Sequence, residues 1–189
     1  MKGSARNLMI VGAASALLSA CGAPPPNTAM TVDGYRVPTH LYDVLVRSSE
    51  RRLQRQGVAV SPSSSAGAAH IKAIEVAAIK KLVRDAALEE LAKGRHIAIT
   101  NGELDTAVGR IEKGVGGAAV VNRQLALDQL SRQDFRDLLR FTLLEQKLSR
   151  ADPKGFPAAL ATALKDAKVT AYVAPCDSNH DYPQCVSGS

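Results

Sequence analysis

The residues of this sequence best suited to chemistry gather near its C-terminus. Cys176 and Cys185 enclose a short polar loop that contains His180. Two cysteines and a histidine can bind zinc, but this spacing fits no common zinc motif, and oxidation of the thiols competes with metal binding. In an exported chain the same two cysteines would form a disulfide, because disulfides persist outside the cytoplasm. We therefore favour a Cys176–Cys185 disulfide and expect no zinc site.

The same loop imitates the start of a calcium-binding site. Its residues Asp177-x-Asn179-x-Asp181 have the alternating oxygen ligands of an EF-hand loop. The sixth position of such a loop should be glycine and is Tyr182, and the twelfth should be glutamate and is Gly188. The sequence therefore predicts no calcium, no other metal and no cofactor.

Acidic and glycine-rich stretches elsewhere offer no better site. Glu89-Glu90, Glu103 and Asp105 fall at the ends and polar faces of predicted helices, where capping and solvation explain them. Gly114-Val-Gly-Gly117 follows no predicted strand and precedes no Lys-Ser or Lys-Thr pair, so we interpret it as a helix break rather than a phosphate-binding loop. We expect no catalytic residue and no cofactor-binding residue.

The composition favours a single helical domain. The chain has 189 residues, of which 46% are hydrophobic, enough to build one core. Aromatic residues make up only 4% and tryptophan is absent, so alanine, leucine, valine and isoleucine must fill that core. Small aliphatic side chains let helices pack closely. The expected fold class is therefore mainly α.

The charge pattern argues against a nucleic-acid partner. The formal net charge is +6, and two of the basic residues, Lys2 and Arg6, lie in a segment that we expect to be removed. Elsewhere basic residues alternate with acids, as in Arg132 to Asp137, which is typical of a solvated helix face. Phe135 within this run has the spacing of a core residue, so we expect no aromatic interleaving that would stack on bases.

The first twenty residues have the layout of a secretion signal. Lys2 and Arg6 precede an apolar run from Leu8 to Leu18 that is too short to span a bilayer comfortably. The run ends in Leu-Ser-Ala-Cys21, which resembles the signal of bacterial lipoproteins. The resemblance implies that residues 1–20 are removed and that Cys21 is lipidated. Ordinary cleavage before Cys21, leaving a free cysteine, is the alternative.

Lipidation at Cys21 would make the protein membrane-anchored and extracytoplasmic. Several acyl chains give stable anchoring, whereas a single chain binds a membrane reversibly. Residues 21–29 include three consecutive prolines and would form a semi-rigid spacer. We therefore expect a lipoprotein of the bacterial cell membrane, facing the envelope or periplasm, in which Cys176 and Cys185 are the cysteines left to pair.

Two short segments are predicted to be β-strands. Residues 30–37 contain two β-like runs around Asp33-Gly34, a strong signal for a tight hairpin turn. Residues 169–173, Val-Thr-Ala-Tyr-Val, are mostly β-branched or aromatic, a composition that favours a strand. Because a single short strand needs a partner, we expect this segment to pair with the hairpin and to join the two ends of the domain.

The chain between these segments is predicted to be helical. Thr100 with Glu103, and Ser131 with Asp134, have the spacing of capping boxes. The second helix has a broad apolar face, which implies burial against more than one partner. Helices are expected from Thr39 to Gly57, Ala69 to Lys93, Thr100 to Gly114, Ala118 to Leu130, Ser131 to Arg150 and Phe156 to Asp166.

The order of these elements resembles a known family. The quoted features are a Val-Asp-Gly hairpin, Leu-Glu-Glu-Leu-Ala-Lys-Gly94, Ile99-Thr-x-x-Glu-Leu-Asp-x-Ala107 and Ser131-x-x-Asp-Phe-Arg-x-Leu-Leu-Arg140. Residues 30–150 resemble the N-terminal domain of SurA-type periplasmic chaperones, and more loosely PrsA foldases and trigger factor. Residues 156–173 resemble the helix and strand with which such proteins return to that module. The resemblance implies a helical chaperone domain over residues 30–173, followed by a tail at residues 174–189.

One departure from the family pattern bears on activity. In SurA and PrsA a parvulin-type prolyl isomerase domain separates the helical module from the returning helix, whereas here residues 151–155 fill the gap. A parvulin site needs clustered histidines, and those of this chain are scattered: His40, His70, His96 and His180. We therefore expect no enzymatic activity.

The resemblance implies that the protein binds unfolded or exported polypeptides. No short motif of the family marks the residues that would contact such clients. Two alternatives remain: a scaffolding lipoprotein that holds one specific envelope partner, and a remnant that acts with a separate isomerase.

Overall fold

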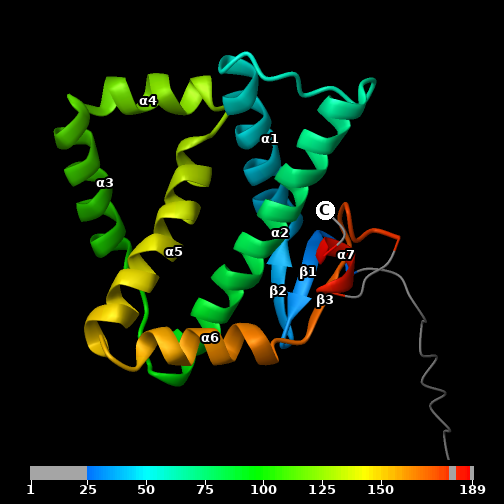
Figure 1. Ribbon diagram of the computed structural model, residues 1–189. Helices are drawn as coiled ribbons and strands as arrows, with labels where there is room; N and C mark the ends of the chain where they lie inside the picture. Colours follow the sequence, from blue (N-terminus) through cyan, green and yellow to red (C-terminus); the bar gives the residue numbers. More distant parts are fainter. Residues whose placement is uncertain (1–24, 179–181, 188–189) are drawn as a thin grey trace, which may run out of the picture.

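The computed structural model describes residues 25–178 and 182–187. In this part of the chain, seven helices and a three-stranded antiparallel sheet form a mainly α fold, as expected (Figure 1). The strands are β1 (Thr28–Val32), β2 (Tyr35–Pro38) and β3 (Val169–Ala171). The helices are α1 (Thr39–Arg55), α2 (Ser65–Gly94), α3 (Asn101–Val115), α4 (Ala118–Leu127), α5 (Arg132–Ala151), α6 (Phe156–Asp166) and α7 (Gln184–Ser187).

The sheet joins segments that lie far apart in the sequence. β1 is the central strand, and β2 and β3 each pair with it in antiparallel fashion. Asp33 and Gly34 connect β1 to β2 with φ angles of 49° and 84°, the left-handed geometry of a two-residue hairpin turn. Met30 lies opposite Ala171 in the β1–β3 ladder, so the predicted pairing of the two segments is confirmed. β1 begins at Thr28, inside the segment expected to be a spacer.

α2 is the longest helix and the axis of the fold. The hydroxyl of Ser64 accepts a hydrogen bond of 3.1 Å from the backbone N–H of Gly67, the usual N-cap arrangement. The helix therefore begins at Ser65, four residues before the predicted start at Ala69, in a serine-rich stretch whose composition favours a loop. A Cβ on Gly67 would collide with the backbone of Ser61, so only glycine permits this close approach.

Two apolar clusters line α2. The first joins α2 to the sheet and to α1, and Met30 and Ile79 are fully buried in it. The second lies where α2 meets α5 and α6, and Leu148 is fully buried there. The predicted broad apolar face of α2 thus contacts several partners, namely α1, α5, α6 and the sheet. Burial of this area is the main source of stability.

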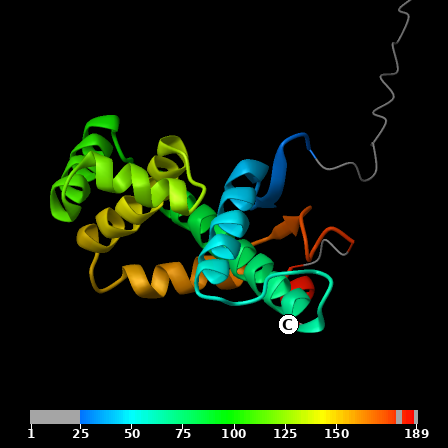
Figure 2. The same ribbon diagram turned by 90° about the horizontal axis from the view of Figure 1, so that it is seen from above.

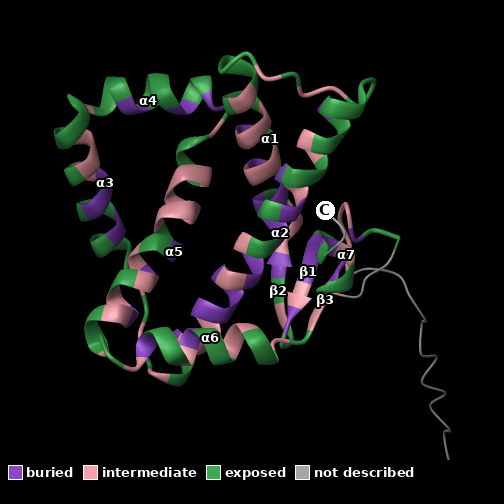
Figure 3. Ribbon diagram, in the orientation of Figure 1, coloured by how far each residue is buried: buried purple, intermediate pink, exposed green. Residues whose placement is uncertain are grey.

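α3 and α4, residues 101–127, form an arm that extends from the rest of the molecule, which we call the body. Figure 2 shows the arm at the end of the molecule opposite the sheet, and both of its helices contact α5. Most of its surface is exposed or half-buried (Figure 3). Its buried residues lie outside the two apolar clusters of the described chain: Leu104, Ala107, Val108, Val121 and Leu125.

Local capping fixes where α3 and α5 begin. The hydroxyl of Thr100 accepts a hydrogen bond from the backbone N–H of Glu103, whose carboxylate accepts one from the backbone N–H of Thr100. Ser131 and Asp134 make the same reciprocal pair at the start of α5. Both predicted capping boxes are confirmed, and they fix the first residue of each helix.

Candidate functional site

The structure brings the two predicted disulfide cysteines together. Cys176 and Cys185 lie at disulfide distance, with their Cα atoms 5.1 Å apart. Cys176 and Val186 of α7 are buried in the first apolar cluster. The hydroxyl of Tyr42 on α1 donates a 2.5 Å hydrogen bond to the carbonyl of Ala174, and burial raises the pKa of this tyrosine. The tail therefore helps to complete the body's core.

Only some of the tail residues considered as metal ligands are described by the structure. Asn179, His180 and Asp181 lie outside the described residues, as does Cys21. In the described residues, no group of three or more histidine, cysteine or acidic side chains could hold a metal ion.

The described histidines lie on separate elements. His40, in the first turn of α1, is 3.8 Å from Asp137 of α5. The ring Nδ1 of His70, near the start of α2, lies 3.0 Å from the carbonyl of Ala59. His96 follows α2 with a φ of 54°. The structure assembles none of them into one site.

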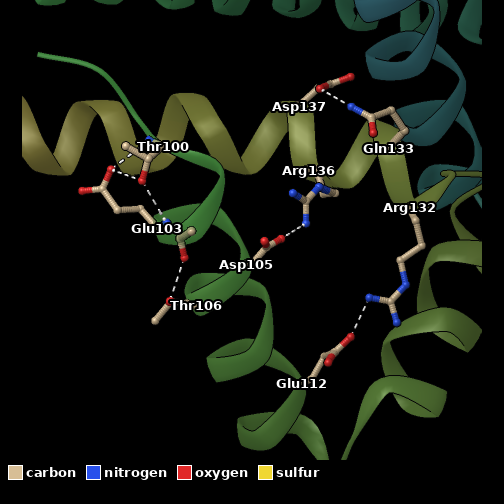
Figure 4. A network of polar contacts seen from close by, with 10 residues as sticks. Thr100, Glu103, Asp105, Thr106, Glu112, Arg132, Gln133, Arg136 and Asp137 are labelled. Carbon is tan, nitrogen blue, oxygen red and sulfur yellow. Dashed lines mark hydrogen bonds and ion pairs between the residues drawn. The ribbon is translucent and has the colours of Figure 1, made fainter.

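The acidic residues considered for acid–base chemistry are held in capping and ion-pair roles. Hydrogen bonds from Lys147 and from Thr100 lower the pKa of Glu103 to about 2. Asp105 lies 2.6 Å from the guanidinium of Arg136 on α5 (Figure 4). Each pair links α3 or its cap to α5, so these carboxylates position the arm.

Further polar contacts fasten the arm at both ends. Arg132 of α5 donates to Glu112 of α3 at 2.5 Å (Figure 4). It also donates to Asn122 of α4 at 2.7 Å. Arg55, the last residue of α1, donates to the carboxylate of Asp128 just beyond α4. Burial acts to raise the pKa of Asp128, but the hydrogen bonds from Arg55 and Gln124 outweigh it and lower the pKa.

A groove of about 410 Å³ runs between α3 and the second half of α5. Ile99 lies at one end of it, and Gly102 beside it. Both helices line the groove with residues at i, i+3, i+4 and i+7, which share one helix face. These residues are Glu103, Thr106, Ala107 and Arg110 from α3, and Leu143, Gln146, Lys147 and Arg150 from α5.

The groove combines an apolar surface with a basic rim. Ile99 also packs against the second apolar cluster, so the groove adjoins the core of the body. Lys147 reaches across it to Glu103, with Nζ 2.6 Å from the carboxylate, and to the carbonyl of Ala98. The groove therefore presents apolar side chains beside positively charged ones.

Comparison with protein families identifies the family to which the chain belongs. The family model described as the SurA-like N-terminal domain matches residues 8–149. The chain belongs to this family. A search of curated proteins and a search of solved structures found no match.

The SurA-like domain is a chaperone-type module and fits an extracytoplasmic protein. Its match ends in the last turn of α5, so α6 and β3 lie beyond it. These two elements pack against α2 and β1, as the sequence resemblance implied. Among the described helices, none is long and apolar enough to cross a membrane.

Sequence reasoning did not identify the groove. A signal was present, because Arg110 and Arg150 each end a stripe at i, i+3, i+4 and i+7. The sequence does not reveal that the two stripes face each other. That arrangement depends on the packing of α3 against α5.

Proposed function

We propose that the protein is a lipid-anchored, extracytoplasmic chaperone-like protein that binds unfolded or exported polypeptides and has no prolyl isomerase activity. Clients would bind on the arm and in the groove beside it. The body would serve as the rigid support that joins this surface to the anchored N-terminus.

The distribution of exposed apolar side chains carries the proposal. Among the described residues, the large apolar side chains that stand clearly exposed are Val115, Val120 and Leu127, at 49%, 40% and 48% exposure. All three lie on the arm of a domain whose family is chaperone-type. Apolar residues gathered on one part of a surface mark interaction sites. Such contacts suit unfolded chains because they do not depend on a particular sequence.

The direct connection from α5 to α6 supports the absence of isomerase activity. α5 ends at Ala151 and α6 begins at Phe156, so no domain is inserted at the position that the isomerase occupies in SurA. A peptide-based prolyl isomerisation assay should give the uncatalysed rate. Acceleration that remains with the protein through successive purification steps would overturn this part of the proposal.

The membrane anchor is supported by the Leu-Ser-Ala-Cys21 signal. Metabolic labelling with a fatty acid should mark the wild-type protein, and Cys21→Ser should remove the label and move the protein out of the membrane fraction. Label that persists in the Cys21→Ser protein would contradict lipidation at this residue.

Client binding is tested by suppression of aggregation. A chain that begins at Gly22 should reduce the light scattering of a reduced, aggregating test protein near equimolar ratio. Val120→Ser with Leu127→Ser should weaken this effect, while the body variant Ala161→Ser on α6 should not. No suppression at large excess would contradict the chaperone proposal and favour a scaffold that holds one specific partner.

A further inference from the structure

We propose that the groove between α3 and α5 binds extended peptide segments in which carboxylates flank apolar residues. This inference rests on the proposed chaperone function and names the class of client that the groove selects. The pairing of charges along the two helices and the apolar surface between them support it.

Two arginines of α3 and α5, Arg110 and Arg150, take no part in the ion pairs between these helices. On α3 and its cap, the acidic residues are each matched by a base on α5: Glu103 with Lys147, Asp105 with Arg136 and Glu112 with Arg132. In the described residues, no carboxylate forms an ion pair with Arg110 or Arg150. Both arginines are exposed, and both line the groove.

Arg150 is unlike the other arginines of its helix. Arg132, Arg136 and Arg140 each pair with an acid of α3 or α2. An arginine presents a planar fork of donors that binds a carboxylate through two parallel hydrogen bonds. With Lys147 neutralised by Glu103, the net charge of the groove comes from Arg110 and Arg150. The occupant that complements this charge is an anion.

The apolar surface between the arginines determines what kind of anion fits. Ala107 and Leu143 face the groove from opposite helices, and Ile99 lies at its end. A small anion would leave this surface in water, and no aromatic residue lines the groove to stack on a nucleobase. An extended peptide can place apolar side chains on this surface and carboxylates at the arginines.

Peptide binding tests this selectivity. The full chain, purified in mild detergent, is titrated into three fluorescent peptides with the same apolar residues and with glutamate, glutamine or lysine at the flanking positions. Fluorescence anisotropy should show the glutamate peptide binding most tightly and the lysine peptide least. Added salt should weaken glutamate-peptide binding more than glutamine-peptide binding, because it screens exposed charges.

Substitutions locate the binding site. Arg110→Gln with Arg150→Gln should weaken glutamate-peptide binding by about threefold to tenfold, from the loss of charge-assisted hydrogen bonds, and should leave glutamine-peptide binding unchanged. Arg110→Lys with Arg150→Lys should retain part of the preference. Arg47→Gln, an exposed arginine of α1 in the body and outside the groove, is the matched control and should have no effect.

The outcomes separate this inference from the proposed function. Equal affinity for the three peptides, or a glutamate preference unchanged in the double glutamine variant, would overturn the groove proposal even if aggregation is still suppressed. Tighter binding of a labelled single-stranded oligonucleotide through the same arginines would overturn it as well. A wild-type protein that neither binds any of the peptides nor suppresses aggregation would overturn the proposed function.

Discussion

The body and the arm are held together by different forces. In the body, residues far apart in sequence fill two apolar clusters along α2, the sheet joins β1 to β3, and the disulfide closes a loop of the tail. The arm buries a few small and medium-sized side chains, and ion pairs fasten it to α5 and α1. Apolar burial resists local opening, whereas exposed ion pairs contribute little. The body is thus built as a support and the arm as an adaptable surface.

The largest contrast should appear when apolar side chains are shortened in each region. Leu82 is 1% exposed and lies in the first apolar cluster. The substitution Leu82→Ala should lower the free energy of unfolding by about 2–5 kcal/mol, because it leaves a cavity in the core. Val120→Ala on the arm should change stability by less than about 0.5 kcal/mol. Urea unfolding of both variants measures the difference, and equal losses would contradict a division between body and arm.

Reduction of the disulfide should weaken the body by about 2–3 kcal/mol, from the entropy of closing its short loop. Urea unfolding of a chain beginning at Gly22, with and without reductant, measures this effect. The Cys176→Ala, Cys185→Ala double variant is the control and should not respond to reductant. A wild-type protein equally stable in both conditions would show that the tail does not contribute to the core.

Two buried carboxylates, one in each region, should respond differently to removal of their charge. Asp128→Asn, at the end of the arm, should lose about 1–2 kcal/mol at neutral pH, because a charge-assisted hydrogen bond with Arg55 is weakened. Asp85→Asn in the body should lose less, since burial raises the pKa of Asp85 despite its contact with Lys81 and so disfavours its charged form.

The stability contributed by Asp128 and by Asp85 should change with pH in opposite directions. The folded pKa of Asp128 is lowered, so its stabilisation is full above the unfolded pKa and is lost as pH falls through the folded value. The gap between wild type and Asp128→Asn should therefore close on acidification. The raised pKa of Asp85 has the opposite sign, so its charge disfavours folding above that pKa. Equal losses in both variants, unchanged by pH, would contradict these assignments.

The smallest effect is expected from the exposed ion pairs of the arm. Arg132→Gln should lower global stability by only about 0.2–1 kcal/mol, and less at high salt. Amide hydrogen exchange in α3 and α4 should nevertheless become faster, because the contacts of Arg132 with Glu112 and Asn122 are lost. Arg123→Gln is the matched control. Equal acceleration in the body would show that the two regions open together.

Local signals in the sequence predicted much of the body and the starts of the arm helices. The capping boxes at Thr100 and Ser131 act over three residues, so spacing alone reveals them. The pairing of β3 with β1 followed because a lone strand needs a partner. The start of α2 was missed because the composition around Ser64 favours a loop, although this serine caps the helix.

The groove and the burial of the tail depend on contacts between distant residues. Arg110 and Arg150 read as ordinary charges on solvated helix faces until α3 is packed against α5. Val186 shows no periodic pattern with its neighbours, and its burial follows from the disulfide that holds it against the sheet. Neither placement can be derived from spacing within one segment.

Site-specific photo-crosslinking most directly tests whether the arm and its groove hold the client. A photoreactive amino acid is placed either at Thr106, which lines the groove, or at Thr162, which is exposed on α6 of the body. After irradiation with a labelled, reduced polypeptide, we expect a strong crosslink from position 106 and little from position 162. Equal crosslinking at both positions, or a stronger product from position 162, would contradict this expectation.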